Sequence, residues 1–145
     1  MSPNEHVAHV AIRATLAACT LAGDARKADA YADAFTKDGV LELDRRIEGR
    51  EAIRRWMTAP SVIPAPSART PGYVSHHLTT CRIILTSTTT AAVRTYWLVI
   101  TAAGLDHSGY YDDRFRREGE AWLIEHRRPR TLWKADDGLV ATAVQ

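Results

Sequence analysis

The chain has 145 residues, of which 46% are apolar and 25% are charged. This size and composition predict a single domain, residues 1–145, built around one hydrophobic core. The net charge of +2 is too small to point to nucleic acid or another polyanion as a partner. We interpret the basic run His126-Arg127-Arg128-Pro129-Arg130 as a solvated strand end, although such a run could also contact phosphates.

The sequence carries no sign of a membrane, metal or cofactor site. No basic-then-apolar signal opens the chain, and no apolar run approaches the roughly 20 residues that cross a bilayer. We therefore expect a cytoplasmic protein. Cys19 and Cys81 match neither a disulfide framework nor a metal-binding motif. Because the histidines form no His-x-x-x-His pair and no phosphate-binding glycine loop is present, we expect neither a metal nor a nucleotide cofactor.

The N-terminal part of the chain has the period of two helices. Residues 5–21 repeat apolar side chains every three or four positions, which predicts an amphipathic helix. Gly23 and Asp24 then provide a helix stop and an N-cap for a second helix over residues 25–35. The stripe that we expect the first helix to bury consists of Val7, Val10, Ala11, Ala14, Ala17, Ala18 and Leu21.

The next segment switches from helical to extended patterning. Lys37-Asp38-Gly39 predicts a turn, and residues 40–44 alternate apolar with polar side chains as a strand does. A short helix is expected to begin at Gly49-Arg50-Glu51 and to bury Ile53, Trp56 and Met57. Residues 59–72 contain four prolines, Pro60, Pro64, Pro66 and Pro71, and are interpreted as a loop that could serve as a lid.

The C-terminal half is rich in β-forming residues. Four runs, 74–86, 91–102, 105–118 and 121–132, are separated by short polar breaks, which predicts an antiparallel meander. Helices followed by strands predict an α+β fold in which the helices pack on one face of the sheet.

The order of these elements resembles the SnoaL-like family of the nuclear transport factor 2 superfamily over nearly the whole chain. The resemblance implies a cone-shaped roll, with N-terminal helices packed on a strongly curved, mainly antiparallel sheet around a pocket. Four stretches carry it: Ala34-Phe35-Thr36-Lys37-Asp38-Gly39-Val40, Ile47-Glu48-Gly49-Arg50-Glu51-Ala52-Ile53, Ser75-His76-His77-Leu78-Thr79 and Gly109-Tyr110-Tyr111-Asp112-Asp113-Arg114-Phe115.

The resemblance implies a range of functions, because the superfamily includes dehydratases, polyketide cyclases, ketosteroid isomerases and proteins without catalysis. The leading hypothesis is a cofactor-free lyase or isomerase. Such an enzyme would move a proton by general acid–base catalysis on a small, apolar, cyclic, oxygenated molecule. The alternative is a non-catalytic small-molecule-binding protein, or an assembly subunit similar to a dioxygenase β subunit.

His76 and His77 are adjacent in a predicted strand, so only one of them can face the pocket. His77 shares its face with the mostly apolar Cys81 and Ile83, which predicts that His77 points inward and acts as a catalytic base. A buried histidine with a structural hydrogen bond is the alternative. In dehydratase relatives, the resemblance implies, an aspartate on the first helix orients this histidine. Here the matching positions fall near Ala18-Cys19-Thr20, and that helix has no aspartate before Asp24.

Asp113 is the second catalytic candidate. Alternation places Gly109, Tyr111 and Asp113 on one face of their strand, which we take as the inner face. Polyketide cyclases of this family resemble the chain in carrying a catalytic aspartate on this strand, near a pair similar to Phe115-Arg116. Asp113 would either orient His77 or act as the acid or base itself. A buried salt bridge with Arg127 is the structural alternative.

Four aromatic residues are the predicted substrate-binding set: Tyr31, Trp56, Tyr96 and Tyr111. The tyrosines could donate hydrogen bonds to a substrate oxygen, and the tryptophan would supply apolar wall.

His107 lies near the position of a second active-site histidine in scytalone dehydratases, but a surface position at a strand end is favoured. The outer sheet face, with Tyr96, Leu98 and Ile100, is apolar enough to predict a homodimer or another homo-oligomer.

Overall fold

The structure is a computed structural model that describes residues 1–60 and 74–138. The helices are α1 (Pro3–Asp24), α2 (Ala28–Asp33) and α3 (Arg50–Thr58). The strands are β1 (Phe35–Glu42), β2 (Arg46–Glu48), β3 (Val74–Leu85), β4 (Thr90–Thr101), β5 (Gly104–Glu118) and β6 (Ala121–Lys134).

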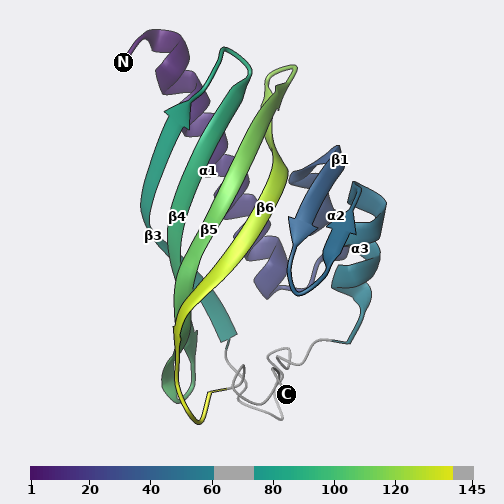
Figure 1. The fold of residues 1–145 in the computed structure, drawn as a ribbon, viewed down its shortest axis with the longest axis vertical. Coiled ribbons are helices and arrows are strands. Elements are labelled where there is room, and N and C mark those ends of the chain that lie inside the picture. The colour runs from purple at the N-terminus through teal and green to yellow at the C-terminus, as the bar shows by residue number, and fades with distance from the viewer. Residues whose placement is uncertain (61–73, 139–145) are drawn as a thin grey trace.

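The strands form one sheet in the order β2-β1-β6-β5-β4-β3, and among the described strands only β1 and β6 pair in parallel. Figure 1 shows β3 to β6 as long bent strands with α1 running along the sheet, while β1, α2 and α3 lie beside β6. The predicted α+β roll is confirmed, and the four long strands begin and end within two residues of their predicted bounds. The core fills the space between α1 and the concave face of the sheet.

The buried face of α1 differs from the predicted stripe. Ile12, Leu16 and Cys19 are buried, whereas Val7 and Leu21 are 66% and 70% exposed. The helix carries apolar residues around most of its circumference, so period alone did not select a face. The two bulkiest side chains of the buried face, Ile12 and Leu16, fill the cone. Ser2 begins the helix with a capping box formed with Glu5, which satisfies backbone N–H groups of the first turn.

The turn predicted at Lys37-Asp38-Gly39 is wrong, because β1 runs through it. Strand β1 starts at Phe35, and a bulge between Phe35 and Val40 shifts its register against β6. Helix α2 is accordingly shorter than predicted. The sequence pattern missed the three-residue strand β2, since so short a segment shows little alternation.

Helix α3 begins as predicted, after Gly49. The φ angle of Gly49 is 89°, a left-handed value that favours glycine at this helix entry. Ile53 and Met57 are buried beneath the helix. The proline-rich segment predicted to be a loop, residues 59–72, lies outside the described residues except for its first two positions. In the part of the chain that the structure describes, no helix has the length and hydropathy of a membrane span.

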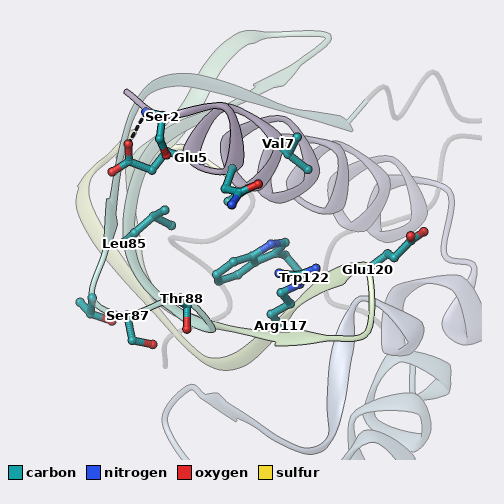
Figure 2. Close-up of a pocket in the computed structure, with 12 residues that line it drawn as sticks. Ser2, Glu5, Val7, Leu85, Ser87, Thr88, Arg117, Glu120 and Trp122 are labelled. Atoms are coloured by element: carbon teal, nitrogen blue, oxygen red, sulfur yellow. Dashed lines mark hydrogen bonds between the residues drawn. The ribbon is translucent and has the colours of Figure 1, made fainter.

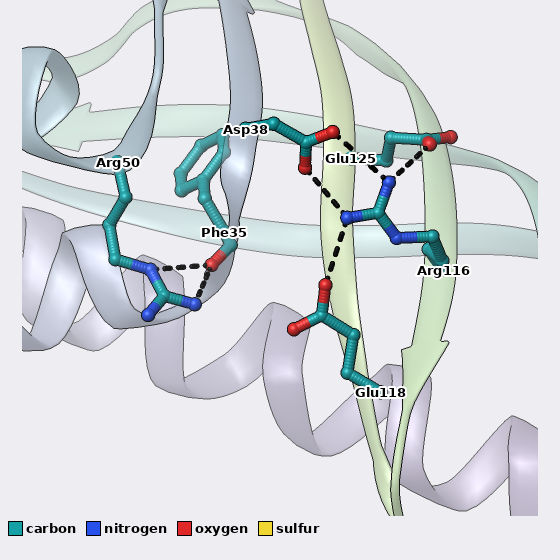
Figure 3. Close-up of polar contacts among 6 residues, drawn as sticks. All are labelled: Phe35, Asp38, Arg50, Arg116, Glu118 and Glu125. Carbon is teal, nitrogen blue, oxygen red and sulfur yellow. Dashed lines mark hydrogen bonds and ion pairs between the residues drawn. The ribbon is translucent and has the colours of Figure 1, made fainter.

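An ionic cluster joins three neighbouring strands at the outer end of the sheet. Arg116 of β5 contacts Asp38 of β1 at 2.6 Å, Glu125 of β6 at 2.8 Å and Glu118 at 2.9 Å, as Figure 3 shows. The guanidinium lowers the pKa of Asp38 to about 2 by hydrogen bonding. The Phe115-Arg116 pair therefore places the aromatic ring in the core and the arginine in this cluster.

Candidate active site

A cavity of about 340 Å³ opens between the C-terminal half of α1, helices α2 and α3, and the inner face of the sheet. It combines an apolar wall with several titratable groups, which is typical of small-molecule sites. Its lining includes Cys19, Thr20, Gly23, Asp24, Arg26, Tyr31, Leu41, Leu43, Trp56, Met57, His76, Trp97, His107, Tyr111, Arg127, Pro129 and Thr131.

His76 and Asp24 form a histidine–carboxylate pair in this cavity. Nδ1 of His76 lies 2.6 Å from Oδ1 of Asp24, and the backbone N–H of His76 donates to Oδ2 of Asp24 at 2.9 Å. An ionised carboxylate only accepts hydrogen bonds, so Nδ1 carries the proton. The lone pair of the neutral imidazole is therefore on Nε2.

The predicted orientation of the histidine pair is wrong: His76 lines the cavity, and His77 is exposed. The reason is a bulge in β3 between Leu78 and Cys81, where three steps on β3 match two on β4. Cys81 and Ile83 face the core as expected. Because of the bulge, the residues before Leu78 lie on the opposite faces from those that simple alternation predicts, so His76 and not His77 is on the inner face. Nε2 of His77 contacts the hydroxyl of Ser75 at 2.8 Å. Asp113, the partner predicted for His77, instead bonds Arg127.

His107 is a second cavity histidine, and its favoured placement on the surface is wrong. It is 6% exposed, and its Nδ1 lies 2.8 Å from Oδ2 of the buried Asp106. Burial lowers the pKa of His107, against the opposing effect of Asp106. An irregularity in the β4–β5 pairing, where Val99 pairs with His107 and Ile100 with Leu105, brings both side chains inward.

Trp97 links the two histidines on the cavity wall. Its ring centroid lies 5.3 Å from that of His107 and 6.4 Å from that of His76, and the two imidazole centroids are 6.4 Å apart. Trp97 pairs with Gly109 across the sheet, and a Cβ there would come within 2.7 Å of the indole. The buried Nε1–H of Trp97 has no hydrogen-bond partner among residues 1–60 and 74–138.

Asp113 forms the structural alternative, a buried salt bridge with Arg127. Two hydrogen bonds join the guanidinium to the carboxylate at 2.9 and 2.7 Å, and both residues are almost fully buried. Burial by itself lowers the pKa of Arg127, but the carboxylate outweighs it and raises that pKa well above its usual value. The guanidinium also lies 4.0 Å from the Tyr111 ring centre.

The structure places three of the four predicted substrate-binding residues in the cavity lining: Tyr31, Trp56 and Tyr111. Burial raises the pKa of Tyr31 well above its usual value and that of Tyr111 to about 12, so both phenols keep their protons at neutral pH. Tyr96 does not belong to this set. It is 45% exposed on the outer sheet face, because residues 91, 93, 95, 97 and 99 take the inner positions of β4. The homodimer expected from that face stays a prediction.

A larger cavity of about 870 Å³ lies at the opposite end of α1. Figure 2 shows Trp122 there, between the first turns of the helix and the ends of the strands. Its charged lining residues are Glu5, Arg117 and Glu120, and Glu5 is engaged in the capping box. Because its lining holds no histidine, tyrosine or cysteine, we assign the candidate active site to the smaller cavity. In the described part of the chain, no three metal-binding side chains cluster.

The family model of the SnoaL-like domain matches residues 5–128. The chain belongs to the SnoaL-like family. No curated protein matches the chain.

Solved structures agree on the fold. An aspartate-to-asparagine variant of Rv3472, a Mycobacterium tuberculosis protein of unknown function, is 27% identical with a TM-score of 0.75; the match covers 94% of this chain and 80% of that one. A scytalone dehydratase candidate from Novosphingobium aromaticivorans is 21% identical with a TM-score of 0.76, covering 94% and 91%.

An NTF2-like protein from the same organism is 20% identical with a TM-score of 0.71, covering 94% and 88%. These likenesses confirm the NTF2-like cone for this SnoaL-like protein.

The sequence pattern missed the Asp24–His76 pair. The sequence pattern predicts Asp24 as an N-cap between the helices, but Asp24 is the last residue of α1 and faces β3. One signal in the sequence points to it: Asp24 is the first aspartate of the chain and ends the first helix.

Proposed function

We propose that this SnoaL-like protein is a dehydratase or isomerase that removes a proton from a carbon beside a carbonyl group, with His76 as the general base. The observation that supports this most strongly is the 2.6 Å contact between Nδ1 of His76 and Asp24. This contact keeps the proton on Nδ1, so Nε2 is the nitrogen that can accept a proton from the substrate. The carboxylate also stabilises the imidazolium that forms. His76 thus takes the role that the sequence assigned to His77.

In the dehydration of a β-hydroxy ketone, Nε2 of His76 takes the proton from the carbon next to the carbonyl. The electrons of that C–H bond form the C=C bond while the C–O bond to the hydroxyl group breaks. The imidazolium then gives its proton to the departing hydroxide, which leaves as water. Asp24 stays ionised throughout and holds the ring, so no cofactor or external reductant enters the balance.

Hydrogen-bond donors in the cavity suit the substrate oxygens. Tyr31 and Tyr111 keep their protons because burial raises their pKa values, so either can donate to a carbonyl that gains negative charge. The Nε1–H of Trp97, a residue of the cavity lining, has no partner within residues 1–60 and 74–138 and is a third candidate donor. Leaving a buried N–H unpaired costs about 1–3 kcal/mol, which a bond to a substrate oxygen would offset. Burial lowers the pKa of His107, which favours the neutral imidazole that can accept a hydrogen bond from a substrate hydroxyl.

The cavity also limits the substrate class. A volume of about 340 Å³ is at the small end of the roughly 300–1,000 Å³ range of ligand pockets. Leu41, Trp56 and Met57 provide its apolar wall. We therefore propose a cyclic, oxygenated and otherwise apolar substrate. The name of the Novosphingobium scytalone dehydratase candidate supports this class.

The neighbouring histidines allow a matched test. A panel of cyclic β-hydroxy ketones is incubated with the protein in D₂O, and NMR follows deuterium entry at the carbon next to the carbonyl and loss of the hydroxyl group. His76→Gln should slow both by about 10²–10⁴-fold, and His77→Gln should leave both unchanged. Loss of turnover in His77→Gln with full activity in His76→Gln would refute the assignment.

The same experiment separates catalysis from binding. A compound that shifts the NMR signals of cavity residues in the wild-type protein, yet exchanges no proton, would indicate a non-catalytic binding protein. The bond between Asp24, at the end of α1, and the cavity histidine supports catalysis over binding alone.

A further inference from the structure

The basic run of β6 divides between the two faces of the sheet. Arg127 points inward and is 2% exposed in its bond with Asp113. Arg128 is exposed, and His126 lies on the same outer face as Arg128. The run is therefore not a uniform solvated strand end, and its outer half joins charges from the neighbouring strands.

Strand register aligns these charges in a row across the sheet. Arg82 of β3 lies opposite Arg94 of β4, Arg94 opposite Asp112 of β5, and Asp112 opposite Arg128 of β6. Two positions along β5, Arg114 projects from the same face. A groove of about 460 Å³ follows the row and is lined by Arg82, Ile84, Ala92, Val93, Arg94, Asp112, Asp113, Arg114, His126 and Arg128.

The positive charge in this groove is only partly balanced. Asp112 contacts Arg94 at 2.7 Å, and His126 contacts Glu42 at 2.7 Å. Within residues 1–60 and 74–138, no ion pair involves Arg82, Arg114 or Arg128. Like charges directly opposite on neighbouring strands destabilise a sheet. The Arg82–Arg94 pairing thus costs stability that an anion in the groove would recover.

We propose that this groove, which is separate from the proposed active site, binds a small ligand through a chain of two or three phosphate groups. Guanidinium groups match phosphate oxygens with paired hydrogen bonds. The row from β3 to β6 spans three inter-strand steps, roughly 14 Å, which suits a linear oligophosphate better than a single phosphate. The Tyr110 ring, 4.4 Å from the guanidinium of Arg94, holds one donor in place. Ile84 and Ala92 offer apolar contact to the rest of the ligand.

The test uses tripolyphosphate as the probe and NMR of arginine side chains as the readout. In the wild-type protein, the Nε–H signals of Arg82, Arg114 and Arg128 should shift and saturate, and the dissociation constant should rise with salt. The double variant Arg82→Gln/Arg114→Gln should bind at least tenfold more weakly. The control Arg45→Gln/Arg55→Gln removes the same charge from exposed positions outside the groove and should bind as the wild type does.

Several results would overturn the proposal. Equal loss of affinity in both double variants would show that binding depends on net charge and not on the groove. Equal affinity for orthophosphate and tripolyphosphate would exclude a row of phosphate subsites. Tighter binding of hexaglutamate would indicate an acidic protein partner, and tighter binding of phosphatidylserine vesicles a membrane surface. Failure of the probe to bind would contradict the proposal. If the sedimentation mass also changed only in Arg82→Gln/Arg114→Gln, this face would instead be a contact between copies of the chain.

Discussion

The carboxylate of Asp24 lies 2.6 Å from Nδ1 of His76, and this contact joins the end of α1 to the start of β3. A second hydrogen bond, from the backbone N–H of His76 to the same carboxylate, fixes the side chain of Asp24 against the strand. The pair therefore determines both the tautomer of His76 and the position of its ring in the cavity.

Asp24→Asn should release the tautomer of His76 while the fold is retained. The amide can present its carbonyl or its NH₂ group to Nδ1, so the exclusive preference for the Nδ1–H form is lost. NMR correlation of the ring nitrogens with the carbon-bound protons measures the tautomer without any substrate. Asp44→Asn, at an exposed site, is the control. An unchanged His76 spectrum in Asp24→Asn would contradict the assignment.

His107 should make stability depend on pH. Its folded-state pKa lies below the ordinary value of 6.5 because of burial, so the unfolded chain binds more protons as the pH falls through that range. The free energy of unfolding contributed by neutral His107 is present above about pH 6.5 and is lost below it. Urea titrations between pH 5 and 8 should show a weaker pH dependence for His107→Gln than for the wild type. Parallel curves would contradict this.

Asp113 should matter for stability more than for chemistry. Asp113→Asn leaves the buried guanidinium of Arg127 without its counter-charge, which should lower the free energy of unfolding by about 3–5 kcal/mol. Asp112→Asn removes a carboxylate from the opposite face of the same strand, where its pair with Arg94 is half exposed. That control should cost about 1 kcal/mol or less. Urea unfolding compares the two.

A further variant separates charge burial from shape at the same site. Asp113→Leu/Arg127→Met replaces both ions with apolar side chains and should recover much of the stability lost in Asp113→Asn, because no uncompensated charge remains. If the paired replacement were as unstable as the single one, the hydrogen bonds of the pair would have to be essential to the fold.

Gly109 should be intolerant of any side chain. A Cβ at this position would lie 1.9 Å from the carbonyl oxygen of Arg130 and 2.7 Å from the Trp97 ring, so backbone and indole must both move. Gly109→Ala should cost about 1–3 kcal/mol or more by overpacking and change the near-UV circular dichroism of Trp97. Ser108→Ala, one residue earlier, should do neither. A near-wild-type spectrum for Gly109→Ala would show that the cavity wall is pliable.

Local patterning predicted the long helix, the short helix α3, the four long strands and the inner face of β5, but not β2 or the start of β1. Gly109, Tyr111, Asp113 and Phe115 take the inner face as alternation predicts, because no bulge separates them in the β4–β5 pairing. Likewise, the approximate bounds of the four long strands follow from runs of β-forming residues between polar breaks.

Bulges explain why the site itself was predicted less well. Alternation extended back from Cys81 and Ile83 assigns His77 to the inner face, but the shift between Leu78 and Cys81 exchanges the faces and brings His76 inward. A similar irregularity between Val99 and Ile100 accompanies the burial of Asp106 and His107. A bulge depends on the pairing of two strands, so one strand's own sequence gives little sign of it.

The sequence by itself determined the kind and order of the longer helices and strands and the family resemblance, because helical and extended periods are properties of the local chain. Only the tertiary structure decided which of two adjacent histidines enters the cavity, that Asp24 is its partner, and that Asp113 belongs to Arg127. Those choices depend on contacts between residues far apart in the chain, set by strand register and by the direction in which α1 crosses the sheet.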